Sequence, residues 1–285
     1  MPVIILDFMQ NIKYSEVSDN FKVLAISSLS STGNAGLKNL MSILGTRIIP
    51  VPTLLISGLG NMDGHRRFAI PFKDFLYETM IMAKKNSYTL IVYTGYLDDV
   101  LQVDIIIEVL QKFREMIRAV VVDPVCGDNE SAYVNASIIT GHARLLALAD
   151  WALPNQTELR LIMGYDFAAS LDVILKRLGN KFPGMQYVIT GEVVNEIINN
   201  YVFDGERLSV VRQTYSGCSY SGTGDAFAAL FIHYCFFQHL SPVDAVKKAG
   251  SDVMQFVTAS MREERACHDL QIAHQFLSPA QSDQI

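Results

Sequence analysis

The stretch Ser221-Gly222-Thr223-Gly224-Asp225-Ala226-Phe227-Ala228-Ala229-Leu230 joins a glycine-rich turn directly to an apolar helical pattern. Unpaired N–H groups and the positive end of a helix dipole make such a turn attractive to phosphate. Glycines at 222 and 224 let a ligand approach the backbone closely. Asp225 would repel a phosphate unless it accepts a proton from a hydroxyl that attacks that phosphate. The alternative interpretation is an ordinary polar helix N-cap.

The surrounding chain has the composition of a globular protein. Its 285 residues are 50% hydrophobic and 18% charged, which is enough apolar sequence for a large core. No Pro/Gly/Ser-rich linker divides it, so we expect one domain over 1–285, with residues 1–20 as an N-terminal extension and 265–285 as a tail. A net charge of -6 without Lys/Arg runs argues against a nucleic-acid partner.

Cysteine spacing and hydropathy predict a soluble, cytoplasmic protein. The four cysteines are scattered without CxxC spacing, as is typical of free thiols in a reducing compartment. Asp7 interrupts the apolar start and no basic segment precedes it, which argues against a signal peptide. No run approaches the roughly 18 apolar residues of a membrane span.

Predicted strands alternate with predicted helices along most of the chain. We expect strands at 22–26, 47–51, 90–93, 119–122, 151–153 and 187–190, followed by a hairpin of 197–203 with 208–213. Helices are expected at 37–44, 72–84, 99–114, 135–148, 157–163, 171–178, 223–238 and 242–261. This order predicts an α/β fold with a mostly parallel central sheet and helices on both faces.

Small or acidic residues follow the predicted strands, where parallel sheets bind their ligands. These segments, which we call strand exits, are the serine loop at 27–34, Thr94-Gly95-Tyr96, Asp123, Asn155 to Glu158, Thr190-Gly191 and the Gly222 turn. Their agreement favours the functional interpretation of Asp225 over the N-cap interpretation. His65 lies in a loop near the expected pocket, and Arg66-Arg67 is interpreted as a solvated pair.

Two of these exits have carboxylates suited to a divalent cation. Asp123-Pro124-Val125-Cys126-Gly127-Asp128 places two of them across a rigid proline turn, so both could face a cation directly or through water. The alternative is an ordinary strand-exit turn. Pro154-Asn155-Gln156-Thr157-Glu158 reads as a capping box, which leaves Asn155 and Glu158 free to face phosphate or metal-bound water as well. Neither a GxxxxGK[ST] loop nor a GxGxxG fingerprint is present.

These motifs, in this order, resemble the ribokinase-like superfamily and, within it, the pyridoxal (vitamin B6) kinases. The similarity covers roughly residues 22–260. Its markers are the runs 25–34, 51–57 (Val-Pro-Thr-Leu-Leu-Ile-Ser), 93–97 (Tyr-Thr-Gly-Tyr-Leu), 121–128, 154–158 and 222–225 (Gly-Thr-Gly-Asp). The resemblance implies a ribokinase-like three-layer sandwich that phosphorylates the hydroxymethyl group of a B6 vitamer with ATP and Mg²⁺. It also implies a homodimer, with a monovalent cation as a further candidate cofactor.

The resemblance also implies a role for each matching position. Asp225 would be the general base, with Gly222, Thr223 and Gly224 as the anion hole. Asp123, Asp128 and Glu158 would arrange the magnesium shell. Asn155, Thr190 and Gly191 would line the ATP site together with Gly222 and Gly224. On the substrate side, Ser28, Ser30, Ser57 and Tyr96 would surround the pyridine ring, next to Asp225.

One segment departs from the family pattern. Family members usually carry Ser-x-His-Thr-Gly after the second strand, whereas this chain has Ser57-Gly58-Leu59-Gly60-Asn61. The Gly-Asp-x-Gly continuation is likewise Gly127-Asp128-Asn129-Glu130. The phosphoryl-transfer half therefore matches better than the substrate half. Two alternatives stay open: a kinase for another small alcohol, such as a hydroxymethylpyrimidine or a sugar, and a non-catalytic protein that binds a vitamer or nucleotide.

Overall fold

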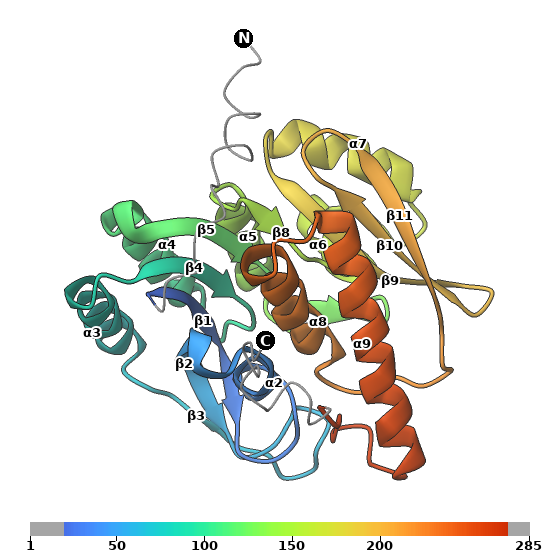
Figure 1. Cartoon of the computed structure of the whole chain (residues 1–285), viewed down its shortest axis with the longest axis horizontal. Helices are drawn as coiled ribbons and strands as arrows, with labels where there is room; N and C mark the ends of the chain where they lie inside the picture. Colours follow the sequence, from blue (N-terminus) through green and yellow to red (C-terminus); the bar gives the residue numbers. More distant parts are fainter. Residues whose placement is uncertain (1–19, 273–285) are drawn as a thin grey trace, which may run out of the picture.

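A central β-sheet organises the part of the chain that the computed structural model describes, residues 20–272. Within these residues nine strands lie in the order β11-β10-β9-β8-β5-β4-β1-β2-β3 (Figure 1). The six strands from β9 across to β2 are parallel, and β3, β10 and β11 run antiparallel to their neighbours. The sheet strands are β1 (Phe21–Ser30), β2 (Ile48–Ile56), β3 (Arg67–Phe68), β4 (Thr89–Thr94), β5 (Ile117–Val122), β8 (Trp151–Ala152), β9 (Gln186–Val194), β10 (Ile197–Phe203) and β11 (Leu208–Thr214).

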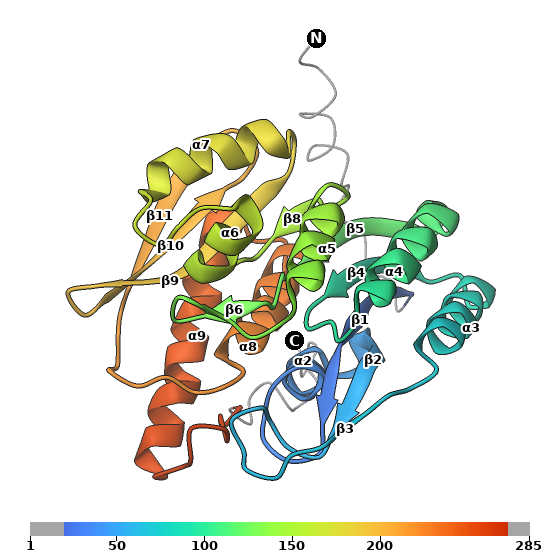
Figure 2. The ribbon, with the colours of Figure 1, turned by 180° about the vertical axis from the view of Figure 1, so that it is seen from behind.

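Helices cover both faces of this sheet. The helices are α2 (Leu37–Leu44), α3 (Phe72–Lys85), α4 (Val100–Lys112), α5 (Ala136–Leu146), α6 (Gln156–Met163), α7 (Leu171–Lys181), α8 (Thr223–Ile232) and α9 (Pro242–Arg262). Helices α2, α8 and α9 lie in front of the sheet in Figure 1, and α3 to α7 lie in front of it in Figure 2. The predicted three-layer α/β fold with a mostly parallel sheet is confirmed.

Alternating side chains of the central strands fill the two cores. Leu24 and Ile26 of β1 pack with the layer of α3 to α7, whereas Val23 and Ala25 pack with α2, α8 and α9. Strands with both faces covered are continuously apolar, which is why 119–122 could be recognised from the sequence.

Strands β1 and β2 are both longer than predicted. The first was expected to end at Ile26, but β1 continues to Ser30 and pairs with β2 as far as Ile56. The buried Ser27 hydroxyl within this extension accepts the amide of Tyr96 at 3.2 Å. The second was expected at 47–51, but β2 continues to Ile56. Its prolines lack an N–H group, and they lie where β2 has no outer partner, since β3 pairs only with Leu55 and Ile56.

Two short strands and one helix end also differ from the prediction. Strands β6 (Gly127–Asp128) and β7 (Ser131–Ala132) form a separate small hairpin that the sequence did not indicate. Helix α8 ends at Ile232, and a π-helical turn at His233–Phe237 continues it where one longer helix was expected. On α2, Met41 is 41% exposed, whereas the polar Asn39 is buried.

The expected terminal segments are only partly described. Residues 1–19 of the N-terminal extension and 273–285 of the tail lie outside the described residues. The described part of the tail packs against the layer of α2, α8 and α9, where Leu270 is fully buried. Among the helices within 20–272, none combines the length and hydropathy that crossing a membrane requires.

His142 is a buried histidine on α5 whose two ring nitrogens lack hydrogen-bond partners. Burial disfavours the charged ring and lowers the pKa of His142 from 6.5 to about 4. The unfolded chain therefore binds more protons than the folded chain between these values, so folded-state stability falls as pH drops from about 6.5 to about 4.

Replacing this ring should remove that acid sensitivity. We expect His142→Leu to be at least as stable as the wild type at pH 7, because two unpaired buried nitrogens are lost. Urea unfolding at pH 7 and near pH 4 should then show that the variant escapes about 3 kcal/mol of acid destabilisation. Parallel stability losses in the two proteins on acidification would show that His142 is not the responsible group.

Candidate active site

Helix α8 begins in a turn that leaves backbone N–H groups without a side-chain cap. Its N-cap is Gly222 in the left-handed region, with φ of 84°. A Cβ at this position would collide with the carbonyl oxygen of Asn34, so both the backbone angle and the close approach require glycine. The start of an uncapped helix carries partial positive charge and free donors, which fits an anion such as phosphate.

Asp225 lies in the first turn of α8, and its side chain is half-buried. Its Oδ2 accepts a hydrogen bond of 2.7 Å from the backbone N–H of Gly36, in the loop between β1 and α2. Burial raises the pKa of Asp225 to about 6, although the Gly36 amide and its own amide favour the charged form. The carboxylate is therefore ionised at neutral pH and is a stronger base than an ordinary aspartate.

Asp123 follows β5 and is buried beside β4. The Tyr93 hydroxyl donates to its Oδ2 at 2.9 Å. Burial, and then the charge of Asp225, raise the pKa of Asp123 to about 8, although the bond from Tyr93 opposes both effects. Asp123 and Asp225 are thus close enough to interact electrostatically, as expected for two residues at the same edge of the sheet.

Glu158 and Asn155 form the predicted capping box at the start of α6. The Asn155 Oδ1 accepts from the Glu158 amide at 2.8 Å, and the Glu158 Oε2 accepts from the Asn155 amide at 2.8 Å. The other oxygen of Glu158 accepts the Cys126 amide at 3.2 Å, and the Asn155 Nδ2 donates to the Gly127 carbonyl at 2.9 Å. Burial, and then the charge of Asp123, raise the pKa of Glu158 well above its ordinary value.

The buried carboxylates are oxygen ligands of the kind that a divalent cation prefers. In the contacts described above, Asp123 and Glu158 accept hydrogen bonds from neutral donors. A neighbouring carboxylate raises the pKa of each. Asp128 is exposed on β6, and its charge also raises the pKa of Glu158. Within residues 20–272, however, no three acidic, His or Cys side chains gather closely enough for direct metal ligation. This arrangement fits Mg²⁺ that retains water ligands.

Thr190 and Gly191 lie in β9, on the side of Asn155 away from Asp123. Thr190 forms a parallel bridge with Asn155, and its amide donates to the Pro154 carbonyl at 3.0 Å. Gly191 has φ of 79°, and its amide donates to Oδ1 of the buried Asn200 at 3.1 Å. The structure therefore brings the two expected nucleotide-side residues next to the capping box.

The two serines expected on the substrate side occupy different environments at the end of β1. Ser28 is half-buried and lies against Gly36, where a Cβ would collide with the Ser28 carbonyl oxygen. Ser28 thus lies near the loop that contacts Asp225. Ser30 is buried, and its hydroxyl donates to the Gly33 carbonyl at 3.2 Å. This hydrogen bond stabilises the loop between β1 and α2.

Tyr96 is fixed by a residue that the sequence interpretation placed in solvent. The Arg67 guanidinium donates to the Tyr96 hydroxyl at 2.6 Å and pairs with Asp98. The Thr53 hydroxyl donates to the Tyr96 carbonyl at 2.9 Å. Arg67 is exposed, as expected of a solvated residue, and short strand β3 also brings it beside the end of β4.

The atypical segment after β2 contacts the Gly222 turn. Ser57 is exposed, and its hydroxyl accepts the Arg66 amide at 2.7 Å, which closes the connection between β2 and β3. Leu59 is buried against Gly33, and the Asn61 Nδ2 donates to the Ser221 hydroxyl at 3.2 Å. The His65 ring contacts the Met62 carbonyl at 2.9 Å. The segment that departs from the family pattern therefore lies at the edge of the candidate site.

Comparison with known proteins identifies the family. The family model described as phosphomethylpyrimidine kinase matches residues 33–275 of this chain. The chain belongs to this kinase family. The predicted resemblance to ribokinase-like vitamin kinases is confirmed.

Relatives of this kinase are named for two different activities. A structure from Bacteroides thetaiotaomicron, named as a candidate phosphomethylpyrimidine kinase, has a TM-score of 0.81 at 26% identity and covers 94% of this chain and 98% of its own. Another crystal form of that protein contains pyridoxal. A Schizosaccharomyces pombe protein named as a candidate pyridoxal kinase is 28% identical over 227 residues, which are 73% of this chain and 72% of that protein.

A more distant structure shares the fold of the kinase. Pyridoxal kinase from Leishmania donovani, in complex with ADP and pyridoxamine, has a TM-score of 0.77 at 22% identity. The match covers 92% of this chain and 97% of that chain. The fold is thus common to proteins named for both activities.

Three residues of the kinase site were missed in the sequence. Asn39 of α2 is 1% exposed, and its Nδ2 donates to the carbonyls of Asn34 at 3.1 Å and Gly222 at 2.9 Å. Asn200 supports Gly191, and Arg67 holds Tyr96. In the sequence, such a residue can be noticed only as a polar residue within an apolar helical or strand pattern. That pattern does not show which distant residue it will bond.

Proposed function

We propose that this kinase transfers a phosphoryl group from ATP to the hydroxymethyl group of a B6 vitamer. The observation that carries the proposal is Asp225 in the first turn of α8, ionised at neutral pH and bonded to the Gly36 amide. A base in this position accepts the proton of the attacking hydroxyl. A carboxylate inside an anion-binding turn is otherwise unfavourable, so proton transfer gives it a reason to be there.

The start of α8 would stabilise the charge that develops during transfer. Gly222, Thr223 and Gly224 would present backbone amides to the transferred group, as an anion hole. Little covalent chemistry is required of the protein in phosphoryl transfer, so positioning and charge stabilisation account for most of the rate. The uncapped first turn of α8 supports this role.

The buried acids would hold Mg²⁺ at the nucleotide. Asp123, Asp128 and Glu158 would arrange its shell, partly through water, since their donor set fits a hydrated cation. When bound, Mg²⁺ neutralises charge on the phosphate oxygens. Asn155, Thr190 and Gly191 would border the nucleotide, and their proximity in the structure supports one shared site.

The other side of Asp225 would receive the vitamer. Ser28, Ser57 and Tyr96 would border its ring, while Ser30 would act through the Gly33 loop. The Bacteroides relative that contains pyridoxal supports a vitamer over other alcohols. Assembly as a homodimer and use of a monovalent cation remain predictions from the resemblance.

Neutralising the proposed base tests the mechanism. In Asp225→Asn the amide oxygen still accepts the Gly36 N–H, so the fold and nucleotide binding should persist. Turnover of pyridoxal should fall by roughly 10²–10⁴-fold, the usual contribution of a general base. Coupled ADP detection measures the rate, and calorimetry measures nucleotide binding.

Asp244→Asn is the matched control, because Asp244 is an exposed acid in the first turn of the neighbouring helix α9. It should retain wild-type turnover. Near wild-type activity in Asp225→Asn would contradict the assignment of the base.

The second candidate is phosphorylation of a hydroxymethylpyrimidine, the alcohol that corresponds to the phosphomethylpyrimidine in the family description and in the name of the Bacteroides relative. The atypical segment at 57–61 lies where substrate would be selected. A panel of pyridoxal, pyridoxine, pyridoxamine, hydroxymethylpyrimidine and ribose should separate the candidates by kcat/KM.

We expect one B6 vitamer to be the best substrate in that panel. Preference for the pyrimidine would replace the vitamer proposal but keep the chemistry. Absence of turnover with every alcohol, together with measurable binding of a vitamer or nucleotide, would favour the non-catalytic alternative.

A further inference from the structure

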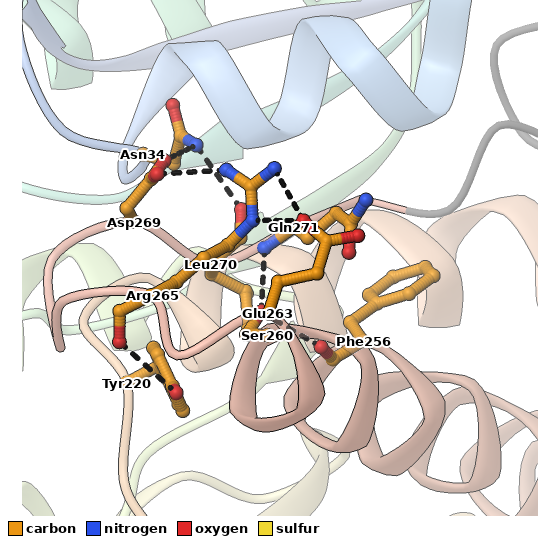
Figure 3. Close-up of polar contacts among 9 residues, drawn as sticks. All are labelled: Asn34, Tyr220, Phe256, Ser260, Glu263, Arg265, Asp269, Leu270 and Gln271. Atoms are coloured by element: carbon orange, nitrogen blue, oxygen red, sulfur yellow. Dashed lines mark hydrogen bonds and ion pairs between the residues drawn. The ribbon is translucent and has the colours of Figure 1, made fainter.

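The chain after α9 returns to the candidate site as an irregular segment with two turns, Glu263–Ile272, which we call the C-terminal strap (Figure 3). Leu270 anchors it by complete burial in the core shared by α2, α8 and α9. The Gln271 amide donates to the buried Ser260 hydroxyl on α9 at 2.8 Å. Both anchors fix the strap to the body of the kinase.

The strap holds Asn34, in the loop between β1 and α2, by three hydrogen bonds. The Asn34 backbone amide donates to the His268 carbonyl at 2.9 Å. Its side-chain Nδ2 donates to the Asp269 Oδ1 at 2.8 Å and to the Leu270 carbonyl at 3.1 Å (Figure 3). Arg265 pairs with the other oxygen of Asp269 at 2.7 Å, which fixes that carboxylate.

The strap also holds the turn that precedes α8. The Ser221 amide donates to the Cys267 carbonyl at 2.8 Å, and the Tyr220 hydroxyl donates to the Arg265 carbonyl at 3.3 Å. The Asn61 Nδ2, from the atypical segment, lies 3.7 Å from the Cys267 sulfur. One short segment therefore joins the β1–α2 loop, the segment after β2 and the start of α8.

Asn34 lies two residues before Gly36, whose amide binds the Asp225 carboxylate. The Asn34 carbonyl accepts a hydrogen bond from the buried Asn39 side chain, which also donates to the Gly222 carbonyl. The loop is thus tied to the α8 turn on one side and to the strap on the other. A shift of Asn34 would move the Gly36 N–H relative to Asp225.

We infer that Asn34 is a positioning residue for phosphoryl transfer, and that Asp269 of the strap holds it in place. This inference rests on the proposed role of Asp225 as the base. Asn34 fixes the loop whose Gly36 amide orients the Asp225 carboxylate. Neither Asn34 nor Asp269 takes part in the chemistry itself.

Two substitutions at Asp269 separate the hydrogen bond from the ion pair. Asp269→Asn keeps an oxygen for the Asn34 amide group but loses the charge that pairs with Arg265. Asp269→Ala loses both. We expect kcat to fall on the order of tenfold in Asp269→Ala, as misplacement of a reacting group does, with KM for ATP unchanged. Asp269→Asn should recover most of that rate.

Hydrogen exchange at the Gly36 amide gives a readout that needs no turnover. Exchange should be faster in Asp269→Ala than in the wild type, and in Asp269→Asn it should return toward the wild-type rate. Arg144→Ala, which breaks the ion pair with Asp104 at 2.7 Å on another face, is the control and should change neither kcat nor Gly36 exchange.

The outcomes distinguish this inference from the proposed function. Wild-type kcat and Gly36 exchange in Asp269→Ala would overturn the positioning role, whatever the substrate. Equal loss in Asp269→Ala and Asp269→Asn would also overturn it, because the ion pair would then be responsible. If the wild type turns over no alcohol, the proposed function fails, and Gly36 exchange still decides whether Asp269 and Asn34 hold the loop.

Discussion

Three acidic side chains, Asp123, Glu158 and Asp225, share a poorly hydrated region at the carboxyl ends of the parallel strands. Burial raises the pKa of each, and Asp123 feels the charge of Asp225 as Glu158 feels that of Asp123. Removing one ion from water costs several kcal/mol unless an opposite charge compensates it. The hydrogen bonds to these groups come from neutral tyrosine and backbone donors, which stabilise but do not neutralise them. A bound cation would compensate the negative charge of the ionised carboxylates, and a phosphate at the start of α8 would in turn compensate the charge of the cation.

The fold places these groups with few elements. Strands β5 and β8 are parallel and end at one side of the sheet, beside the middle of β9, so Asp123, Asn155 and Thr190 lie on adjacent parts of the sheet although they are distant in sequence. Helix α8 approaches the same edge from the other layer and brings Asp225. Glycine at 222 permits the close approach between α8 and the β1–α2 loop. The electrostatic problem is therefore a consequence of sheet topology, and the start of α8 adds the complementary positive end of a helix dipole.

Local sequence was sufficient for the features that lie within one element. Alternation of strands and helices predicted the layers, and polar residues after apolar strands predicted Asp123, Asn155 and the Asp225 turn. The missed features depend on partners far along the chain: Asn39 with Gly222, Arg67 with Tyr96, and Asn34 with Asp269. Hydrophobic periodicity shows which face of an element is buried, but it does not show which polar group faces it across an interface. The extension of β1 through Ser27 was missed for the same reason, since the Tyr96 amide makes that buried serine acceptable.

In the proposed mechanism the buried carboxylates are arranged around a cation beside the start of α8, where phosphate would bind. Anomalous diffraction from crystals grown with Mn²⁺ and ADP tests it directly, because Mn²⁺ replaces Mg²⁺ in oxygen-ligand sites and can be located without assumptions. We expect one strong peak between the carboxylates of Asp123 and Glu158 and the start of α8, bridged to them by water or direct contact. A nucleotide bound with its Mn²⁺ peak elsewhere, and with these carboxylates left facing one another, would show that they do not hold the cation.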